Sequence, residues 1–221
     1  MLPIVFGVLF RTPLPLTALQ VLSIDMGTDV LPSLALRAEP PEAGVLDAPP
    51  RNQRESLLNR EVAGRILLLG TIVAATAIAG FVATLLRGGW IWGQRLPSTA
   101  GLYRQAITMT NAGIVVAQIA NGYENRTDRA SLFRVGLFSN AFLNFGEATA
   151  VAIILAIVYW PPAQAFFSTA AIPAWGWAIT VAGGVVLLAT QEVRKAIVRY
   201  ARGRNAVHGT HLEPSRRRIC D

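Results

Sequence analysis

Long apolar runs separated by short polar segments dominate the sequence. A membrane-spanning helix needs about 20 mostly apolar residues to cross about 30 Å of hydrocarbon. Five runs are long enough: Leu14–Leu36, Ile66–Leu86, Ile107–Tyr123, Val135–Tyr159 and Ala170–Gln191. A sixth run, Leu2–Phe10, is only about half as long as a span. The pattern predicts an all-α membrane protein, a bundle of five full transmembrane helices plus a truncated first span.

The first full run contains residues that do not suit a continuous membrane helix. Asp25 and Asp29 stand in its middle, and Gly27 between them lowers helix propensity. Pro32 has no N–H to offer the carbonyl of Thr28, four residues earlier. Irregular backbone at membrane depth is tolerated where it lines a cavity. We therefore expect one discontinuous helix with its free carbonyls facing such a cavity.

The charged residues are few and lie mostly at the ends of the apolar runs. Only 15% of the residues are charged, against about 25% in soluble domains. The formal net charge of +7 would otherwise suggest a nucleic-acid partner. However, when the spans alternate, most basic residues fall on one side of the membrane, in residues 37–65, in residues 124–134 and from Arg194 onward. The basic charge thus reflects topology, and we expect a lipid-bilayer partner and no nucleic acid.

The same distribution predicts orientation and domain organisation. Under the positive-inside rule the side rich in arginine is cytoplasmic. We expect a multi-pass integral protein of the plasma (inner) membrane with a cytoplasmic C-terminus. Residues 1–200 would form the membrane domain, and residues 201–221 a basic, disordered cytoplasmic tail.

The two intramembrane aspartates are the strongest candidates for chemistry. Each costs roughly 2.5–3.5 kcal/mol at a helix centre, and in a helix the spacing of Asp25 and Asp29 places both carboxylates on one face. With the Thr28 hydroxyl they provide the oxygen ligands that hard cations prefer. The alternative is that both acids are protonated or pair with arginines. Because no basic residue lies inside a predicted span, we favour cation or proton binding.

Three further polar residues are weaker candidates. Gln118 and Asn121 share a helix face, and their spacing alone favours a hydrogen bond between helices over a ligand role. Glu147 is an intramembrane acid and so a functional candidate by default. Its position near one end of its run leaves open that it simply reaches the membrane interface.

Residues 13–36 resemble the sixth membrane span of type II P-type ATPases, the branch that contains calcium, sodium/potassium and proton/potassium pumps. The matching segments are Pro13-Leu-Pro-Leu16, Gln20-Val-Leu22, Asp25-Met-Gly-Thr28-Asp29 and Leu31-Pro-Ser33. Met26 and Ser33 replace the usual leucine and alanine. Later segments resemble the eighth to tenth spans: Gly113–Gln118, Arg126–Phe133, Gly136–Asn140, Trp160–Pro162 and Glu192–Ala196.

The resemblance implies roles for specific residues. Four of them fall on positions that coordinate the transported cation in the family: Asp25, Thr28, Asp29 and Gln118. Asn121 falls where some sodium/potassium-type relatives have an aspartate, and Glu147 matches no known ligand. The resemblance implies no cofactor in this chain, since ATP and Mg²⁺ would act only through domains that the sequence lacks. The cation would be the transported substrate, and its identity is not readable.

The resemblance also sets what the chain could do alone. The sequence lacks the phosphorylated Asp-Lys-Thr-Gly motif and a nucleotide-binding domain, so whether it acts as an enzyme stays open. We expect an N-terminal ATPase half as partner, either a separate chain or missing sequence. A truncated gene, a misplaced start and a split pump are all compatible with this. The alternatives are a passive cation channel or carrier and an inactive remnant of a truncated pump.

Overall fold

A computed structural model describes residues 2–38, 60–127, 131–132, 136 and 138–209, without the side chains of 61 and 201–209. The regular elements among the described residues are all helices, and no described residue is in a strand. In chain order the elements are α1 (Leu2–Leu9), α2 (Ala18–Leu22), the π-helical segment η1 (Ser23–Thr28), α3 (Val30–Arg37), α4 (Arg60–Arg87), α5 (Gly101–Glu124), α7 (Ala141–Tyr159), α8 (Pro161–Phe167) and α9 (Ala174–Gly209).

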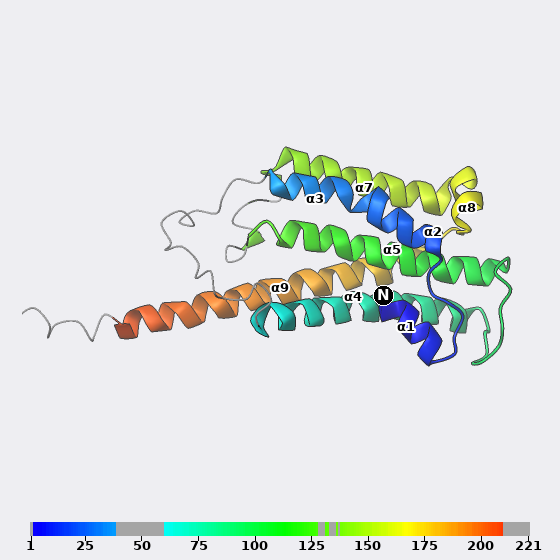
Figure 1. Ribbon diagram of the computed structural model, residues 1–221, viewed down its shortest axis with the longest axis horizontal. Coiled ribbons are helices and arrows are strands. Elements are labelled where there is room, and N and C mark those ends of the chain that lie inside the picture. The colour runs from blue at the N-terminus through cyan, green and yellow to red at the C-terminus, as the bar shows by residue number, and fades with distance from the viewer. Residues whose placement is uncertain (1, 39–59, 128–130, 133–135, 137, 210–221) are drawn as a thin grey trace, which may run out of the picture.

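The bundle is built around α5. Figure 1 shows α5 running through the middle, with α3 and α7 on one side and α4 and α9 on the other. Small residues allow the close approach of α4, α5 and α9, as is common between membrane helices. A Cβ at Gly113 of α5 would lie 3.4 Å from the Ala77 backbone of α4, and one at Gly184 of α9 would lie 3.0 Å from Val116 of α5.

Within the part of the chain that the structure describes, three helices are long and apolar enough to cross a membrane: α4, α7 and α9. The central helix α5 is 24 residues long but is not among them, which corrects the expectation of five full spans. The reason is its polar content, since Thr108, Thr110 and Asn111 are all fully buried. The surrounding helices shield these side chains, so α5 needs less apolar surface than its neighbours.

The predicted run Leu14–Leu36 forms a broken helix. Thr17 caps α2 through a capping box with Gln20, so Pro13–Leu16 stays outside the helix. The α-helical pattern then changes to the π pattern of η1 and is interrupted at Asp29 before α3 begins. The predicted discontinuity is therefore present, in the form of a π-helical turn.

Two helix boundaries differ from those expected. Helix α7 begins at Ala141 rather than near Val135, because Asn140 caps it by accepting the Leu143 N–H at 2.9 Å. At the other end of the chain α9 continues to Gly209, past residue 200, where we expected a disordered tail to begin. Residues 210–221 lie outside the described part.

The helices alternate in direction, as the sequence predicted. The C-terminal ends of α3, α5 and α9 lie at one end of the bundle in Figure 1. Aromatic contacts mark the opposite end, where the Arg87 guanidinium lies 4.6 Å from the Trp175 ring and the Trp177 indole donates to the Tyr159 hydroxyl at 2.7 Å.

A buried ion pair joins α5 to α9. Lys195 Nζ lies 2.7 Å from Glu124 Oε2, and neither side chain is exposed. The ammonium also donates to the Glu124 carbonyl at 3.0 Å and to Thr127 at 3.4 Å. Lys195 was expected among the cytoplasmic basic residues that follow the last span, but it packs inside the bundle.

Candidate functional site

A small cavity of about 100 Å³ lies where η1, α3, α5 and α7 meet. It brings together five of the six residues that sequence analysis had singled out, although they come from three separate parts of the chain. Its full lining is Thr28, Asp29, Pro32, Ser33, Leu36, Gln118, Asn121, Gly122, Asn125 and Glu147. Carboxylate, hydroxyl and amide oxygens thus line one cavity inside an apolar bundle.

The π-helical turn places Thr28 on the wall of the cavity. Its side chain is buried, and its hydroxyl lies 3.0 Å from the Ile24 carbonyl and 3.5 Å from Gln118 Oε1. The longer contact brings η1 next to the centre of α5. Such π-helical turns are rare in proteins overall, and those that occur are often at functional sites. Gly27 and Pro32 flank the position, and both weaken a regular α-helix here.

The two aspartates occupy different surroundings. Asp29, in the break between η1 and α3, lines the cavity, whereas Asp25 does not. Both residues are exposed on the surface of this chain. The expectation of a carboxylate pair on one face assumed regular α-helical geometry, and η1 does not have it.

Helix α5 contributes a row of amides to the cavity. Gln118, Asn121 and Asn125 follow one face of the helix at helical spacing. The buried Asn121 Oδ1 has no hydrogen-bond partner among the described residues. A carbonyl-type oxygen without a donor is available to a cation.

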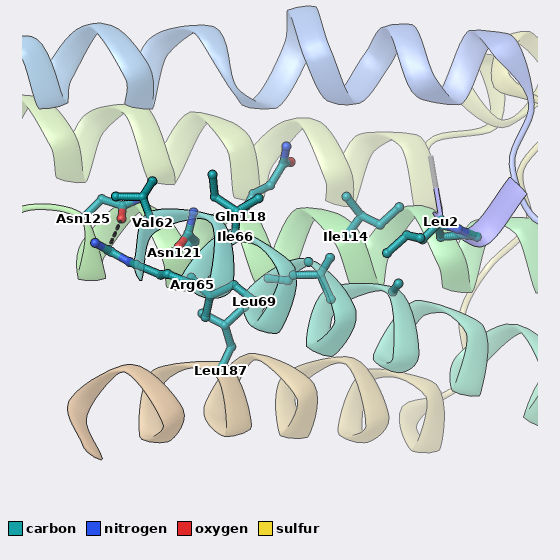
Figure 2. Close-up of a pocket in the computed structure, with 15 residues that line it drawn as sticks. Leu2, Val62, Arg65, Ile66, Leu69, Ile114, Gln118, Asn121, Asn125 and Leu187 are labelled. Carbon is teal, nitrogen blue, oxygen red and sulfur yellow. Dashed lines mark hydrogen bonds between the residues drawn. The ribbon is translucent and has the colours of Figure 1, made fainter. Parts of the chain in front are cut away.

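The same three amides border a second, larger cavity of about 730 Å³ between α1, α4, α5 and α9. Figure 2 shows this groove, with Arg65 donating to Asn125 Oδ1 at 3.0 Å near one end and Leu2 at the other. Most of its remaining lining is apolar. The amide row of α5 therefore lies between the small polar cavity and the larger groove.

Glu147 of α7 is buried in the bundle and does not reach its surface. Only 3% of the residue is exposed, and it lines the small cavity opposite α5. Its Oε1 atom is buried and has no hydrogen-bond partner among the described residues. The residue is therefore enclosed by the helices of this chain, and its depth in the membrane stays a prediction.

Among the residues that the structure describes, no group of three or more His, Cys, Asp or Glu side chains is positioned to hold a metal ion. Carboxylates therefore make up only part of the cavity's donor set, and the rest are hydroxyl and amide oxygens. Oxygen-only donors suit hard cations rather than transition metals.

One charged pair and one contact partner are not indicated by any pattern in the sequence. Glu124 and Lys195 were assigned to polar segments outside the membrane, yet they form the buried pair that fixes α5 to α9. Gly122, which contacts Glu147 in the cavity, carries no chemistry of its own. Both contacts join residues far apart in the chain, so no local spacing indicates them.

The long apolar helices α4, α7 and α9 are typical of a multi-pass integral membrane protein. Residues 13–197 match the family model described as "Cation transporting ATPase, C-terminus". The chain therefore belongs to this family and represents the C-terminal membrane region of P-type cation-transporting ATPases.

Relatives of the chain carry names of several cation-transporting ATPases. It is 28% identical over 180 residues to the calcium-transporting ATPase of Bacillus subtilis, an alignment that covers 81% of this chain and 19% of the relative. It is 26% identical over 223 residues to potassium-transporting ATPase alpha chain 2 of Oryctolagus cuniculus, covering 89% and 20%. A probable cation-transporting ATPase F of Mycobacterium bovis is 30% identical over 164 residues, covering 74% and 17%. The chain thus spans about a fifth of the length of these relatives.

Proposed function

We propose that this chain provides the cation-coordinating part of a P-type cation-transporting ATPase and a section of its translocation path. The observation that carries the proposal is the cavity between η1, α5 and α7, where oxygen donors from distant parts of the chain meet inside an apolar bundle. Family membership supports it, since the relatives are named for the transport of calcium, potassium or other cations.

Each side chain has a distinct part in the proposed site. Asp29 supplies a negative charge at the helix break, and Thr28 supplies a hydroxyl beside it. Gln118 and Asn121 supply amide oxygens from α5. Their combined field replaces part of the hydration shell that a cation loses on entering the bundle. Asp25 lies outside the cavity, where it is accessible to helices from the rest of the pump.

The energy for transport would come from the rest of the pump. The described helices provide no phosphorylation or nucleotide-binding domain, so ATP and Mg²⁺ would act through an N-terminal ATPase part. We propose that the assembled pump lies in the plasma (inner) membrane with the C-terminus of this chain in the cytoplasm, as the positive-inside rule favours. The basic end of the bundle would then face the phosphorylation machinery.

The proposal is tested by cation-dependent thermal unfolding of the full chain purified in detergent, with K⁺, Na⁺ and Ca²⁺ titrated separately. At least one cation is expected to raise the unfolding temperature of the wild-type chain, because a ligand that binds the folded state stabilises it. Asp29→Asn is expected to abolish this stabilisation. Asp25→Asn, the matched change outside the cavity, is expected to reduce it less.

Two outcomes would overturn the proposal. One is the absence of stabilisation by any of the three cations, or its full retention in Asp29→Asn. The other is cation flux through liposomes that contain the purified chain alone, without ATP, which would indicate a passive channel.

A further inference from the structure

We propose that Glu147 is a further cation ligand, so that the bound cation joins η1, α5 and α7. This inference rests on the proposed function and extends its ligand set to a helix that the other ligands do not reach. Three observations support it: the burial of Glu147, the charge balance of the cavity and the space that Gly122 leaves for the carboxylate.

The burial of Glu147 requires a compensating partner. The residue is 97% buried, since its relative exposure is 3%, and its Oε1 atom faces no hydrogen-bond donor among the described residues. A buried carboxylate without a partner is strongly unfavourable, and such groups are normally paired or coordinate a metal ion. The described part of the chain offers Glu147 no ion pair, so an ionised Glu147 needs a partner from outside it.

The charge balance of the cavity indicates what that partner is. Asp29 and Glu147 both line it, and its lining contains no lysine, arginine or histidine. The buried ammonium of Lys195 is already paired with Glu124. A mobile cation held between the two carboxylates would compensate both of them, and the neutral oxygens of Thr28 and Asn121 would complete its coordination.

Gly122 determines where the carboxylate of Glu147 can lie. A Cβ atom at residue 122 would overlap with Glu147 Oε1, so only glycine leaves room for this carboxylate against α5. At the preceding residue of α7, a Cβ at Gly146 would lie 3.0 Å from the backbone nitrogen of Pro32. Glycines thus hold α7 close to both α5 and α3, with Glu147 between these helices.

The test uses the same thermal-unfolding titration of the full chain in detergent, with Glu147→Gln as the main variant. The substitution preserves shape and removes the charge. It is expected to weaken binding of the stabilising cation by about tenfold or more, a factor that equals about 1.4 kcal/mol. Without added cation, its unfolding temperature is expected to equal or exceed that of the wild type, because a buried charge has been removed.

Gly122→Ala provides an independent variant, because its methyl group displaces the carboxylate without removing it. It is expected to weaken cation binding severalfold, and Glu147→Asp is expected to retain more affinity than Glu147→Gln. The double variant Gly122→Ala/Glu147→Gln should bind the cation no more weakly than Glu147→Gln alone. Such non-additivity is the signature of two residues that act through one contact.

The possible outcomes separate this inference from the proposed function. If Asp29→Asn abolishes stabilisation but Glu147→Gln binds the cation like the wild type, the Glu147 assignment is overturned and the proposed function stands. A Glu147→Gln chain that is less stable without cation, with unchanged affinity, would show a structural role and also overturn the assignment. If no cation stabilises the wild type, both proposals fail.

Discussion

The ion pair between Lys195 and Glu124 shows how one buried pair of charges can connect two helices. Both side chains are fully buried, and the ammonium contacts a carboxylate, a carbonyl and the Thr127 hydroxyl. Glu192 reinforces the same end of α9 by accepting the Leu132 N–H at 2.8 Å. These contacts tie the segment after α5 to α9, close to the amide row of the candidate site.

Removing one member of this pair should be costly. Lys195→Ala leaves Glu124 buried without its partner, and the expected loss is about 3–5 kcal/mol in the free energy of unfolding. The double variant Lys195→Met/Glu124→Leu should recover most of that loss, because apolar residues of similar volume often replace a buried ion pair without penalty. Denaturant unfolding of the purified chain measures both. A loss below about 1 kcal/mol for Lys195→Ala would show that the pair contributes little.

At the scale of elements, the broken helix formed by α2, η1 and α3 determines the site. An unbroken α-helix through residues 18–37 would carry Thr28 and Asp29 in a different orientation relative to α5. The π-helical turn and the interruption at Asp29 bring both residues to the cavity wall. The geometry of this turn is therefore expected to control cation affinity.

Gly27→Ala tests that dependence. The added methyl would meet only Ile153, at 3.6 Å, and alanine favours the α-helix over glycine by about 1 kcal/mol. Stability should therefore be maintained or rise, while regular α-helix is promoted at η1 and cation affinity falls by roughly tenfold, which equals about 1.4 kcal/mol. Thermal unfolding with and without cation measures both effects.

Gly64→Ala in α4 is the matched control, because nothing lies within 4 Å of its added methyl. It should give a similar gain in stability with unchanged cation affinity. Loss of affinity in both variants would show that the effect does not come from η1.

Local sequence features were sufficient to predict the helix break and the cavity residues next to it. Asp29, Thr28 and Pro32 can be recognised in the sequence because polar and helix-breaking residues are rare in apolar spans. Gln118 and Asn121 were found by resemblance, since their spacing alone favoured a simple helix contact. The position of Glu147 against Gly122 depends on how α7 packs on α5, and no local pattern records that contact. The start of α7 was missed because Asn140 caps it beyond an apolar stretch.

At the scale of the whole molecule, the bundle has two chemically different ends. Arg37 at the end of α3 and Arg60 at the start of α4 lie at one end, and aromatic contacts such as Arg87 on Trp175 lie at the other. Polar residues are concentrated on the central helix α5, which the apolar helices surround. This arrangement fits a protein whose interior, rather than its surface, carries the function.

The proposed orientation predicts which end is accessible from outside the cell. The sequence contains one cysteine, Cys220, so a Cys220→Ser background allows single new cysteines to be labelled. Ser98→Cys, at an exposed site between α4 and α5, should react with an impermeant maleimide in intact cells. Ala38→Cys, exposed just after α3, should react only after the cells are opened. The reverse pattern would invert the orientation.

The sharing of Gln118 and Asn121 by two cavities has a consequence for exchange. Both cavities have these amide side chains in their walls. An ion passing from one cavity to the other would therefore meet rotatable amide groups. We therefore expect the affinity of the cavity oxygens for the ion, more than the rigidity of the bundle, to determine the residence time of the ion.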